Sequence, residues 1–327
     1  MGGIGALHAR NALASDRIEL VAVASSDAAH ARELAAELGG GVAGVTVDGL
    51  LDDVPVDAVI VSCATADHLA YARRVLEHGS HLFLEKPGTA TLAQHAELTD
   101  LALRAGVVVT VGYMRRHDPA FASLKRRVDE GAIGVPSFVS LVSREAVVAA
   151  GALHRAGGFI VDLGVHDFDV AAWLLGQEPV EAYAVVQRTK AVHLAFDSAL
   201  VVVRFDRGGI AHVHLSCVSA AGHDIRCEVV GTAGSIAIDG LAEGVASLEP
   251  VDATRSGAAP QNFTERFAVA LRGELEAFCD RCAGVPAEGA DLLDDRRALA
   301  IGVAARASAN RREPLAVGPD WEWFGPM

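Results

Sequence analysis

The chain has 327 residues, of which 51% are hydrophobic and 21% are charged, so it is long enough for two domains with sizeable cores. The formal net charge of -14, without a stripe of basic residues, argues against a surface that binds nucleic acid or an anionic membrane. Chemistry on a small molecule is therefore the class of function that we expect.

The first part of the chain alternates short apolar runs with Ala-rich helical stretches. Continuously apolar strands that are joined by helices predict a parallel sheet covered on both faces, which is the doubly wound architecture that binds nucleotides. The expected strands are 18–24, 58–62, 81–84 and 107–112, and the expected helices are 28–38, 68–78 and 92–105.

The glycine-rich segment 1–5 precedes a helical stretch and resembles part of a dinucleotide fingerprint, G-x-G-x-x-G. Gly2 and Gly5 would be its second and third glycines, of which one lets the backbone approach a pyrophosphate and the other lets the helix pack on a strand. The first glycine and the strand that should precede it are missing. We therefore expect the native protein to carry a few more residues upstream of Met1.

The end of the second expected strand bears on the choice of cofactor. About twenty residues after the last glycine, an acidic residue normally binds the ribose hydroxyls of NAD. Here the position is Ser25, followed by Ser26 and Asp27. A serine removes the carboxylate that would repel a 2'-phosphate, yet no arginine adjoins it. NAD and NADP both stay open, and we lean slightly toward NADP.

The tripeptide Glu85-Lys86-Pro87 follows the expected strand 81–84. A lysine at the carboxyl end of a parallel strand points into the crevice where such sheets bind ligands, and Pro87 fixes the turn that carries it. A Glu-Lys pair at a strand end is also common on solvated surfaces. The tripeptide is much more specific at this place in the chain than the pair alone.

From about residue 135 the pattern changes to Val-rich strands linked by Gly and Asp turns, which predicts a second, mainly antiparallel sheet. We expect an α/β protein with an N-terminal doubly wound domain, residues 1–115, and a C-terminal α+β domain, residues 116–327. The expected strands of the second domain are 136–143, 180–188, 199–205, 209–216 and 224–230, and its helices are 121–130, 263–282 and 291–310.

One further helix is expected from Asp162 onward, on one face of this sheet. It contains the candidate catalytic residues of the second domain. Its apolar stripe contains Phe168, Ala171, Ala172 and Leu175. Asp162 and His166 share a face because side chains four residues apart are neighbours on a helix. A carboxylate one turn before an imidazole fixes the ring and favours its protonated form, which suits a general base. The simpler alternative is an ordinary surface pair.

Five cysteines are too few and odd in number for a disulfide framework, which suits a reducing cytoplasm. Cys279 and Cys282 form a C-x-x-C without a second pair, and His212 and His214 lack a third ligand. We interpret both pairs as packing residues and expect no metal site. No apolar run approaches the length of a membrane span, so we expect a cytoplasmic protein without a membrane partner.

The combination of these motifs resembles the glucose-fructose oxidoreductase and inositol dehydrogenase family, Gfo/Idh/MocA, and among its members the inositol 2-dehydrogenases most. The resemblance covers essentially the whole chain and implies a Rossmann domain plus an antiparallel domain whose sheet often forms a homodimer or homotetramer interface. It depends on the glycine segment with His8, on Glu85-Lys86-Pro87, on Gly112-Tyr113-Met114-Arg115-Arg116, and on Gly157-Gly158 with Asp162 and His166.

This resemblance implies an NAD(P)-dependent oxidoreductase that transfers hydride between a nicotinamide and a cyclic polyol, sugar or keto-sugar. His166 would exchange the hydroxyl proton, Asp162 would orient His166, and Lys86 would stabilise negative charge on the reacting oxygen. The substrate-binding residues would be Met114, Arg115, Asp162 and His166. The cofactor-binding residues would be Gly2, Gly3, Ile4, Gly5, Ser25, Ser26, Thr65, His68, Glu85 and Lys86.

Two positions depart from the inositol dehydrogenase pattern. Leu163 stands where a threonine usually follows the helix aspartate, and Leu271 stands where a tyrosine is common. The loss of two hydroxyls predicts a less hydroxylated or differently substituted substrate, such as an amino- or deoxy-sugar or a cyclitol intermediate. The alternative function is a non-catalytic sensor of the cofactor on the same fold. The complete set of Lys86, Asp162 and His166 favours an enzyme.

Overall fold

The computed structural model describes residues 3–145, 158–188, 196–219, 223–238, 245–246 and 262–318. The chain forms two compact units. The first contains Met1–His117 and Val269–Leu292, and the second contains Asp118–Ala268 and Leu293–Met327. The expected domain boundary after residue 115 stays a prediction, and the sequence did not indicate that the segment 269–292 returns to the first unit.

Parallel strands form the centre of the first unit, as the sequence predicted. They are β1 (Ala22–Ser25), β2 (Ala43–Thr46), β3 (Ala58–Val61), β4 (His81–Glu85) and β5 (Val109–Gly112). β1 pairs with β2, while β3, β4 and β5 form a separate parallel sheet in that order. Within the described residues, no pairing joins β1 to β3. β4 lies in the middle of its sheet and is almost wholly buried, so its carboxyl end is firmly placed.

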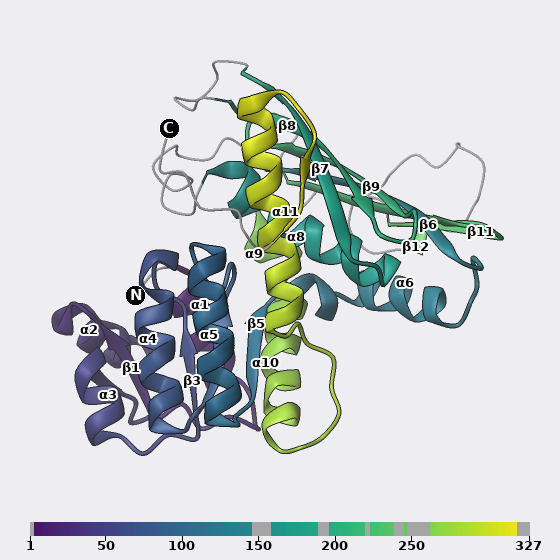
Figure 1. Cartoon of the computed structure of the whole chain (residues 1–327). Coiled ribbons are helices and arrows are strands. Elements are labelled where there is room, and N and C mark those ends of the chain that lie inside the picture. Colours follow the sequence, from purple (N-terminus) through teal and green to yellow (C-terminus); the bar gives the residue numbers. More distant parts are fainter. Residues whose placement is uncertain are drawn as a thin grey trace. The chain divides into compact units, whose positions relative to one another are not determined.

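Helices follow most of these strands, and local sequence explains where they begin and end. They are α1 (Gly3–Leu13), α2 (Ala28–Leu38), α3 (Val47–Asp53), α4 (Thr65–His78), α5 (Leu92–Ala105) and the 3-10 helix η1 (Met114–His117). Asp27 and Thr91 cap the amino ends of α2 and α5, and left-handed Gly79 and Gly106 end α4 and α5. α4 and α5 lie side by side, and α4 packs on β4 (Figure 1).

A late helix completes the first unit. α10 (Ala268–Cys282) lies beside β5 (Figure 1) and packs Leu275 and Phe278 against Phe83 of β4. The Phe83 and Phe278 rings meet edge to face, with centroids 5.7 Å apart. Cys282 packs against the same cluster, and burial raises the pKa of its thiol to about 11, which supports the packing interpretation of the C-x-x-C.

The predicted continuous helix 263–282 is wrong at one point. The chain forms a short helix α9 (Phe263–Arg266), leaves helical geometry at Phe267 and resumes as α10. Phe267 is 1% exposed and lies edge to face with the ring of His223. Burial of this ring therefore coincides with the break in the helix.

An eight-stranded sheet forms the second unit, in the order β12-β11-β10-β6-β9-β8-β7-β13. Its neighbours are antiparallel except for the parallel pair β6 and β9. The strands are β6 (Pro136–Arg144), β7 (Pro179–Gln187), β8 (Ser198–Phe205), β9 (Ile210–Ser216), β10 (Asp224–Gly231), β11 (Gly234–Ile238), β12 (Val245–Ala246) and β13 (Leu315–Ala316). The predicted mainly antiparallel sheet is confirmed.

Helix α8 (Phe159–Leu175) covers one face of this sheet by packing on β6 and β9. The Ser143 hydroxyl on β6 donates a 2.8 Å hydrogen bond to the Asp167 carboxylate on α8. The helices α6 (Pro119–Asp129) and α11 (Leu292–Arg311), and the short α9, also belong to this unit. α8 begins three residues earlier than the sequence predicted, at Phe159 instead of Asp162.

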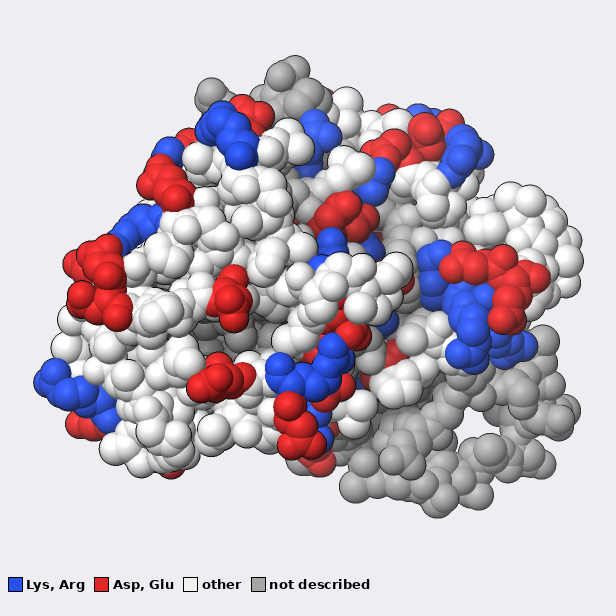
Figure 2. Space-filling model, turned by 90° about the horizontal axis from the view of Figure 1, so that it is seen from below, with Lys and Arg blue, Asp and Glu red and all other residues white. Residues whose placement is uncertain are grey.

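Charged side chains on the face seen in Figure 2 occur in small groups of mixed sign, and neither sign covers a large area of it. In the described part of the chain, no helix has both the length and the apolar character needed to cross a bilayer.

Candidate active site

The carboxyl ends of β3, β4 and β5 place several of the predicted site residues at one edge of a sheet. The strands are in register, with Val61 beside Leu84 and Glu85 beside Gly112, so the residues that follow them lie together. Thr65 begins α4 after β3, Lys86 follows β4, and Met114 and Arg115 belong to η1 after β5. Other predicted cofactor-binding residues are Gly3, Ile4 and Gly5 at the start of α1, and Ser25 and Ser26 at the end of β1 and just after it. Gly2 lies outside the described residues.

The Glu85 carboxylate is held on both of its oxygens. The His8 ring on α1 donates from Nε2 to Oε1 over 2.7 Å, and the Lys86 amide donates to Oε2 over 3.1 Å. A Cβ atom at Gly112 would lie only 3.3 Å from Oε1 and 3.2 Å from the Phe83 ring, so glycine permits this close approach of β5. These contacts fix the first residue of the Glu85-Lys86-Pro87 turn.

His68 holds the other end of the same turn. This imidazole is 1% exposed. Its Nδ1 lies 3.1 Å from the Pro87 carbonyl oxygen and its Nε2 lies 3.3 Å from the Cys63 carbonyl oxygen. The ring therefore bridges the loop after β3 and the turn after β4, where the Lys86-Pro87 peptide is cis. In the structure, His68 supports the turn that carries Lys86.

Two buried carboxyl groups near this turn, those of Glu85 and Glu274, have pKa values shifted in opposite directions. Burial opposes ionisation of Glu85, but the hydrogen bond from His8 and the charges of His8, Lys86 and His68 outweigh it, and the pKa of Glu85 is lowered. Glu274 on α10 has the opposite behaviour, because burial and the nearby Glu85 raise its pKa well above 4.5. Sequence reasoning missed Glu274, although an acid among the buried residues Leu271, Leu275 and Phe278 was a signal that could have found it.

The first unit has donors and charges that fit a dinucleotide. Ala64 makes no side-chain hydrogen bond to the amino end of α4, so the first amides of that helix are not capped by this residue. A Cβ atom at Gly3 would meet nothing within 4 Å, which leaves open space at the start of α1. Asp27 accepts from two amides of α2, and these hydrogen bonds lower its pKa, so a carboxylate stands just beyond the end of β1.

The η1 segment after β5 is buried although it is strongly basic. Met114 and Arg115 are each 2% exposed, and Arg116 is 4% exposed with Glu288 3.5 Å away. Burial, followed by the charges of Arg116 and Arg281, lowers the pKa of His117 to about 4. The expected substrate-binding role of Met114 and Arg115 stays a prediction, and both residues lie at the sheet edge that the role requires.

The second unit carries the other predicted catalytic residues. Asp162 is half-buried in the first turn of α8, and His166 follows one turn later with 6% exposure. Gly158, with φ of 89°, occupies the position before the helix, and Gly157 lies outside the described residues. The orientation of His166 by Asp162, and the joint action of both with Lys86 of the first unit, stay predictions.

Models of known protein families match parts of both units. Residues 1–113 match the oxidoreductase family with an NAD-binding Rossmann fold, and residues 121–237 match the GFO/IDH/MocA C-terminal domain. The chain belongs to the Gfo/Idh/MocA oxidoreductase family. The resemblance and the fold class that the sequence predicted are therefore confirmed.

Several relatives of this Gfo/Idh/MocA chain extend over nearly its whole length. It is 32% identical to the scyllo-inositol 2-dehydrogenase (NAD(+)) of Bacillus subtilis (strain 168), with 96% of this chain and 94% of the relative covered. It is 33% identical to inositol 2-dehydrogenase 1 of Saccharopolyspora erythraea, with 97% and 94% covered.

Solved structures agree with this assignment. A myo-inositol dehydrogenase from Lactobacillus casei, in complex with NAD(H) and myo-inositol, has a TM-score of 0.86 at 26% identity, with 97% of this chain and 94% of that chain covered. A probable dehydrogenase from Thermotoga maritima has a TM-score of 0.86 at 29% identity, with 97% and 96% covered.

The chain is thus an enzyme, an oxidoreductase that transfers hydride between a nicotinamide cofactor and a CH-OH group. The alternative of a non-catalytic sensor is not favoured. The family binds NAD, and the expected lean toward NADP has no support among these relatives.

Proposed function

We propose that this chain is an NAD-dependent dehydrogenase of the inositol type, which oxidises a ring CH-OH group of a cyclic polyol or a closely related sugar, or reduces the matching ketone. The observation that carries this proposal is the likeness, over nearly the whole length of both chains, to relatives named inositol 2-dehydrogenases. The sequence adds the turn with Lys86 and the α8 pair of Asp162 and His166, which are the residue types that proton transfer at an alcohol needs.

The first unit would hold NAD at the carboxyl ends of its parallel strands. The amides of Gly3, Ile4 and Gly5 at the start of α1 would bind the pyrophosphate, because helix amino ends favour anions. Ser25 and Ser26 would lie near the adenosine ribose, and Thr65 and His68 near the other half of the cofactor. Asp27 keeps a negative charge just beyond β1. This carboxylate would repel a 2'-phosphate, which supports NAD over NADP.

The chemistry divides between cofactor and protein. When bound, NAD supplies the hydride acceptor. His166 would take the proton from the substrate hydroxyl during oxidation and return it during reduction, and Asp162 would orient the imidazole for this transfer. The Lys86 ammonium would stabilise negative charge that develops on the same oxygen.

Substrate selection would depend on a few pocket residues. Met114 and Arg115 would contact the ring and its hydroxyls. Leu163 and Leu271 stand where inositol dehydrogenases commonly have hydroxyl side chains, and both are buried, with 8% and 2% exposure. A pocket with two fewer hydroxyls favours a substrate with fewer or replaced hydroxyl groups over a fully hydroxylated one.

The direct test is the formation of NADH with a panel of cyclic polyols and sugars. The panel contains myo-inositol, scyllo-inositol, deoxy- and amino-sugars, and each compound is offered with NAD and with NADP. We expect turnover with NAD and at least one ring compound, and a higher kcat/KM with NAD than with NADP. An absence of turnover across the panel in both directions would contradict the proposal. A preference for NADP would contradict the assignment of the cofactor alone.

The second unit also supports a proposal about assembly. Tyr183, Val185, Leu200 and Ile210 are exposed apolar side chains on β7, β8 and β9. Exposed apolar side chains on this face of the sheet suit a homodimer or homotetramer interface. The five cysteines are all free thiols, which supports a reducing cytoplasmic location.

A further inference from the structure

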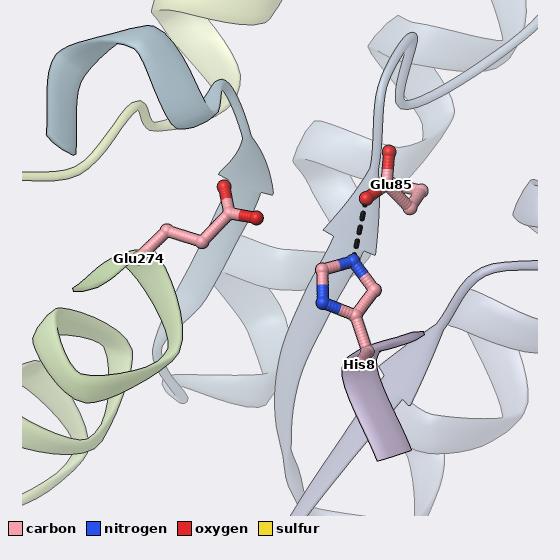
Figure 3. A group of neighbouring side chains, drawn as sticks. All are labelled: His8, Glu85 and Glu274. Atoms are coloured by element: carbon pink, nitrogen blue, oxygen red, sulfur yellow. Dashed lines mark hydrogen bonds and ion pairs between the residues drawn. The ribbon is translucent and has the colours of Figure 1, made fainter. Parts of the chain in front are cut away.

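Three ionisable side chains from distant parts of the sequence meet inside the first unit. They are His8 of α1, Glu85 of β4 and Glu274 of α10, and one ligand atom from each lies within 4.8 Å of the others. Figure 3 shows the Glu274 carboxyl group directed toward Glu85 and His8. Glu274 is 1% exposed, and within the described residues neither of its oxygens has a hydrogen-bond partner.

An ionised carboxylate in this position would be costly. A buried charge without hydrogen bonds loses its hydration, and a second carboxylate nearby adds repulsion. Two carboxyl groups in such a site are most stable when one of them keeps a proton. The His8 ring and the Lys86 amide both donate to Glu85, so the negative charge belongs on Glu85 and the proton belongs on Glu274.

Other charges near the pair reinforce this division. Glu85 is the ionised group that acts on Glu274, while Lys86 and His68 stabilise the charge of Glu85. On the side of η1, a Cβ atom at Gly273, next to Glu274, would lie 3.6 Å from the Cβ of His117. The charged groups that act on the pair itself are His8, His68 and Lys86, while His117 lies beside the neighbouring Gly273, and Arg116 and Arg281 act on His117.

We propose that Glu274 is a positioning residue, which holds a proton and donates it in a hydrogen bond, directly or through one enclosed water, to the carboxylate of Glu85. Glu85 is thereby fixed from α10 as well as from α1. Because the other Glu85 oxygen accepts from the Lys86 amide, α10 helps to set the position of Lys86. The effect on catalysis rests on the proposed role of Lys86, whereas the proton on Glu274 does not.

A bound divalent cation is the competing explanation for these three residue types. Two observations favour the shared proton. His8 and Glu85 already form a complete hydrogen bond at 2.7 Å. The Glu85 oxygens are both engaged by donors, whereas both oxygens of Glu274 and the Nδ1 atom of His8 lack a partner among the described residues.

The first experiment measures stability against pH for the wild type, E274Q and E276Q. The pKa of Glu274 is raised above the ordinary value of 4.5, so its favourable contribution is present at low pH and is lost as the pH rises through the raised pKa. The side-chain amide introduced by E274Q has no such proton to lose. The compared quantity is the Tm of E274Q minus the Tm of the wild type. We expect this difference to increase by about 2 to 4 °C as the pH rises from acidic to mildly alkaline. E276Q, a change at a half-buried acid on the same helix, should show no such gain.

Infrared spectroscopy reads the proton directly, without any assay of activity. At neutral pH the wild type should show the C=O band of a buried carboxylic acid that is missing in E274Q and retained in E276Q. The absence of this difference would overturn the proposal. A loss of stability in E274Q that grows with pH, together with about one equivalent of metal by elemental analysis, would overturn it in favour of a cation site.

Kinetics test the positioning effect. We expect E274L to lower kcat by up to about a hundredfold with a smaller change in the KM for NAD, because a displaced reacting group is costly even when the change is remote. E274Q, which can still donate a hydrogen bond to Glu85, should recover most of that loss. Equal kcat values in E274L and E274Q would show that no donated hydrogen bond is needed. If the wild type shows no dehydrogenase activity, the proposed function fails, while the pH and infrared measurements still decide the state of Glu274.

Discussion

Lys86 is held through the backbone on both sides. Its amide donates to Glu85, and the carbonyl of the next residue, Pro87, lies 3.1 Å from His68. A side chain that stabilises charge in a transition state is most effective when its position is fixed before the substrate arrives. The two supporting residues, Glu85 and His68, were expected to contact the cofactor, and the structure gives each of them a role in the turn itself.

Substitution tests the proposed proton-transfer groups, Lys86 and His166. We expect K86A and H166A each to lower kcat by roughly two to four powers of ten, with a much smaller change in the affinity for NAD. Lys125 and His78 lie elsewhere on α6 and α4, so K125A and H78A serve as controls of matched chemistry. Single-turnover measurements isolate the chemical step. Near-native rates in either site variant would remove that residue from the mechanism.

Candidate site residues near strand ends could be proposed from the sequence, because open parallel sheets bind ligands at the carboxyl ends of their strands. Lys86 was proposed in this way, whereas Met114 and Arg115 were proposed from the resemblance to the family, and the roles of all three stay predictions. Glu274 could not be, because its significance depends on which part of the fold α10 covers. A helical pattern shows that one face is buried but not which strand it meets, and the partners of Glu274 lie far away in the sequence.

The helices with clear end signals were predicted best. α2 and α5 have the predicted bounds because a capping Asp or Thr begins each helix and a glycine ends it. β2 and α3 were missed, since β2 is only partly buried and lacks a continuous apolar run. The break at Phe267 was also missed, because a buried aromatic residue continues the apolar pattern of the helices on either side.

The helix α10 also carries a prediction about specificity. Leu271 lies on the same buried face as Glu274, and Leu163 follows Asp162 on α8. We expect L271Y and L163T each to raise kcat/KM for myo-inositol relative to a deoxy analogue by about tenfold, as one added hydrogen bond would give. The paired assay controls for changes in overall activity. An unchanged ratio in both variants would mean that these positions do not select the substrate.

The sheet of the second unit has two different faces. Ala184, Val201 and Val203 are buried, whereas their strand neighbours Val185 and Leu200 are exposed. Successive side chains on a strand point to opposite faces, so the exposed apolar residues share the face away from the core. The residues Val185 and Leu200 are directly paired across β7 and β8.

This face carries the prediction about assembly. We expect the wild type to form dimers or tetramers, and we expect L200E to lower the mass because a buried charge in an apolar interface is unfavourable. Light scattering coupled to size exclusion gives the mass directly. Leu103 on α5 is 76% exposed, so L103E is the control and should leave the mass unchanged. A wild type that is monomeric at micromolar concentration would contradict the assignment of this face.

The return of the chain to its first unit has a consequence for biosynthesis. Residues up to His117 leave the ribosome well before Leu275 and Phe278, which cover Phe83. The nascent first unit therefore keeps Phe83 uncovered until α10 has been synthesised, and an exposed apolar surface of this kind favours aggregation during that interval. For the same reason, a chimera that exchanges this unit with a relative must transplant two separate pieces of the gene.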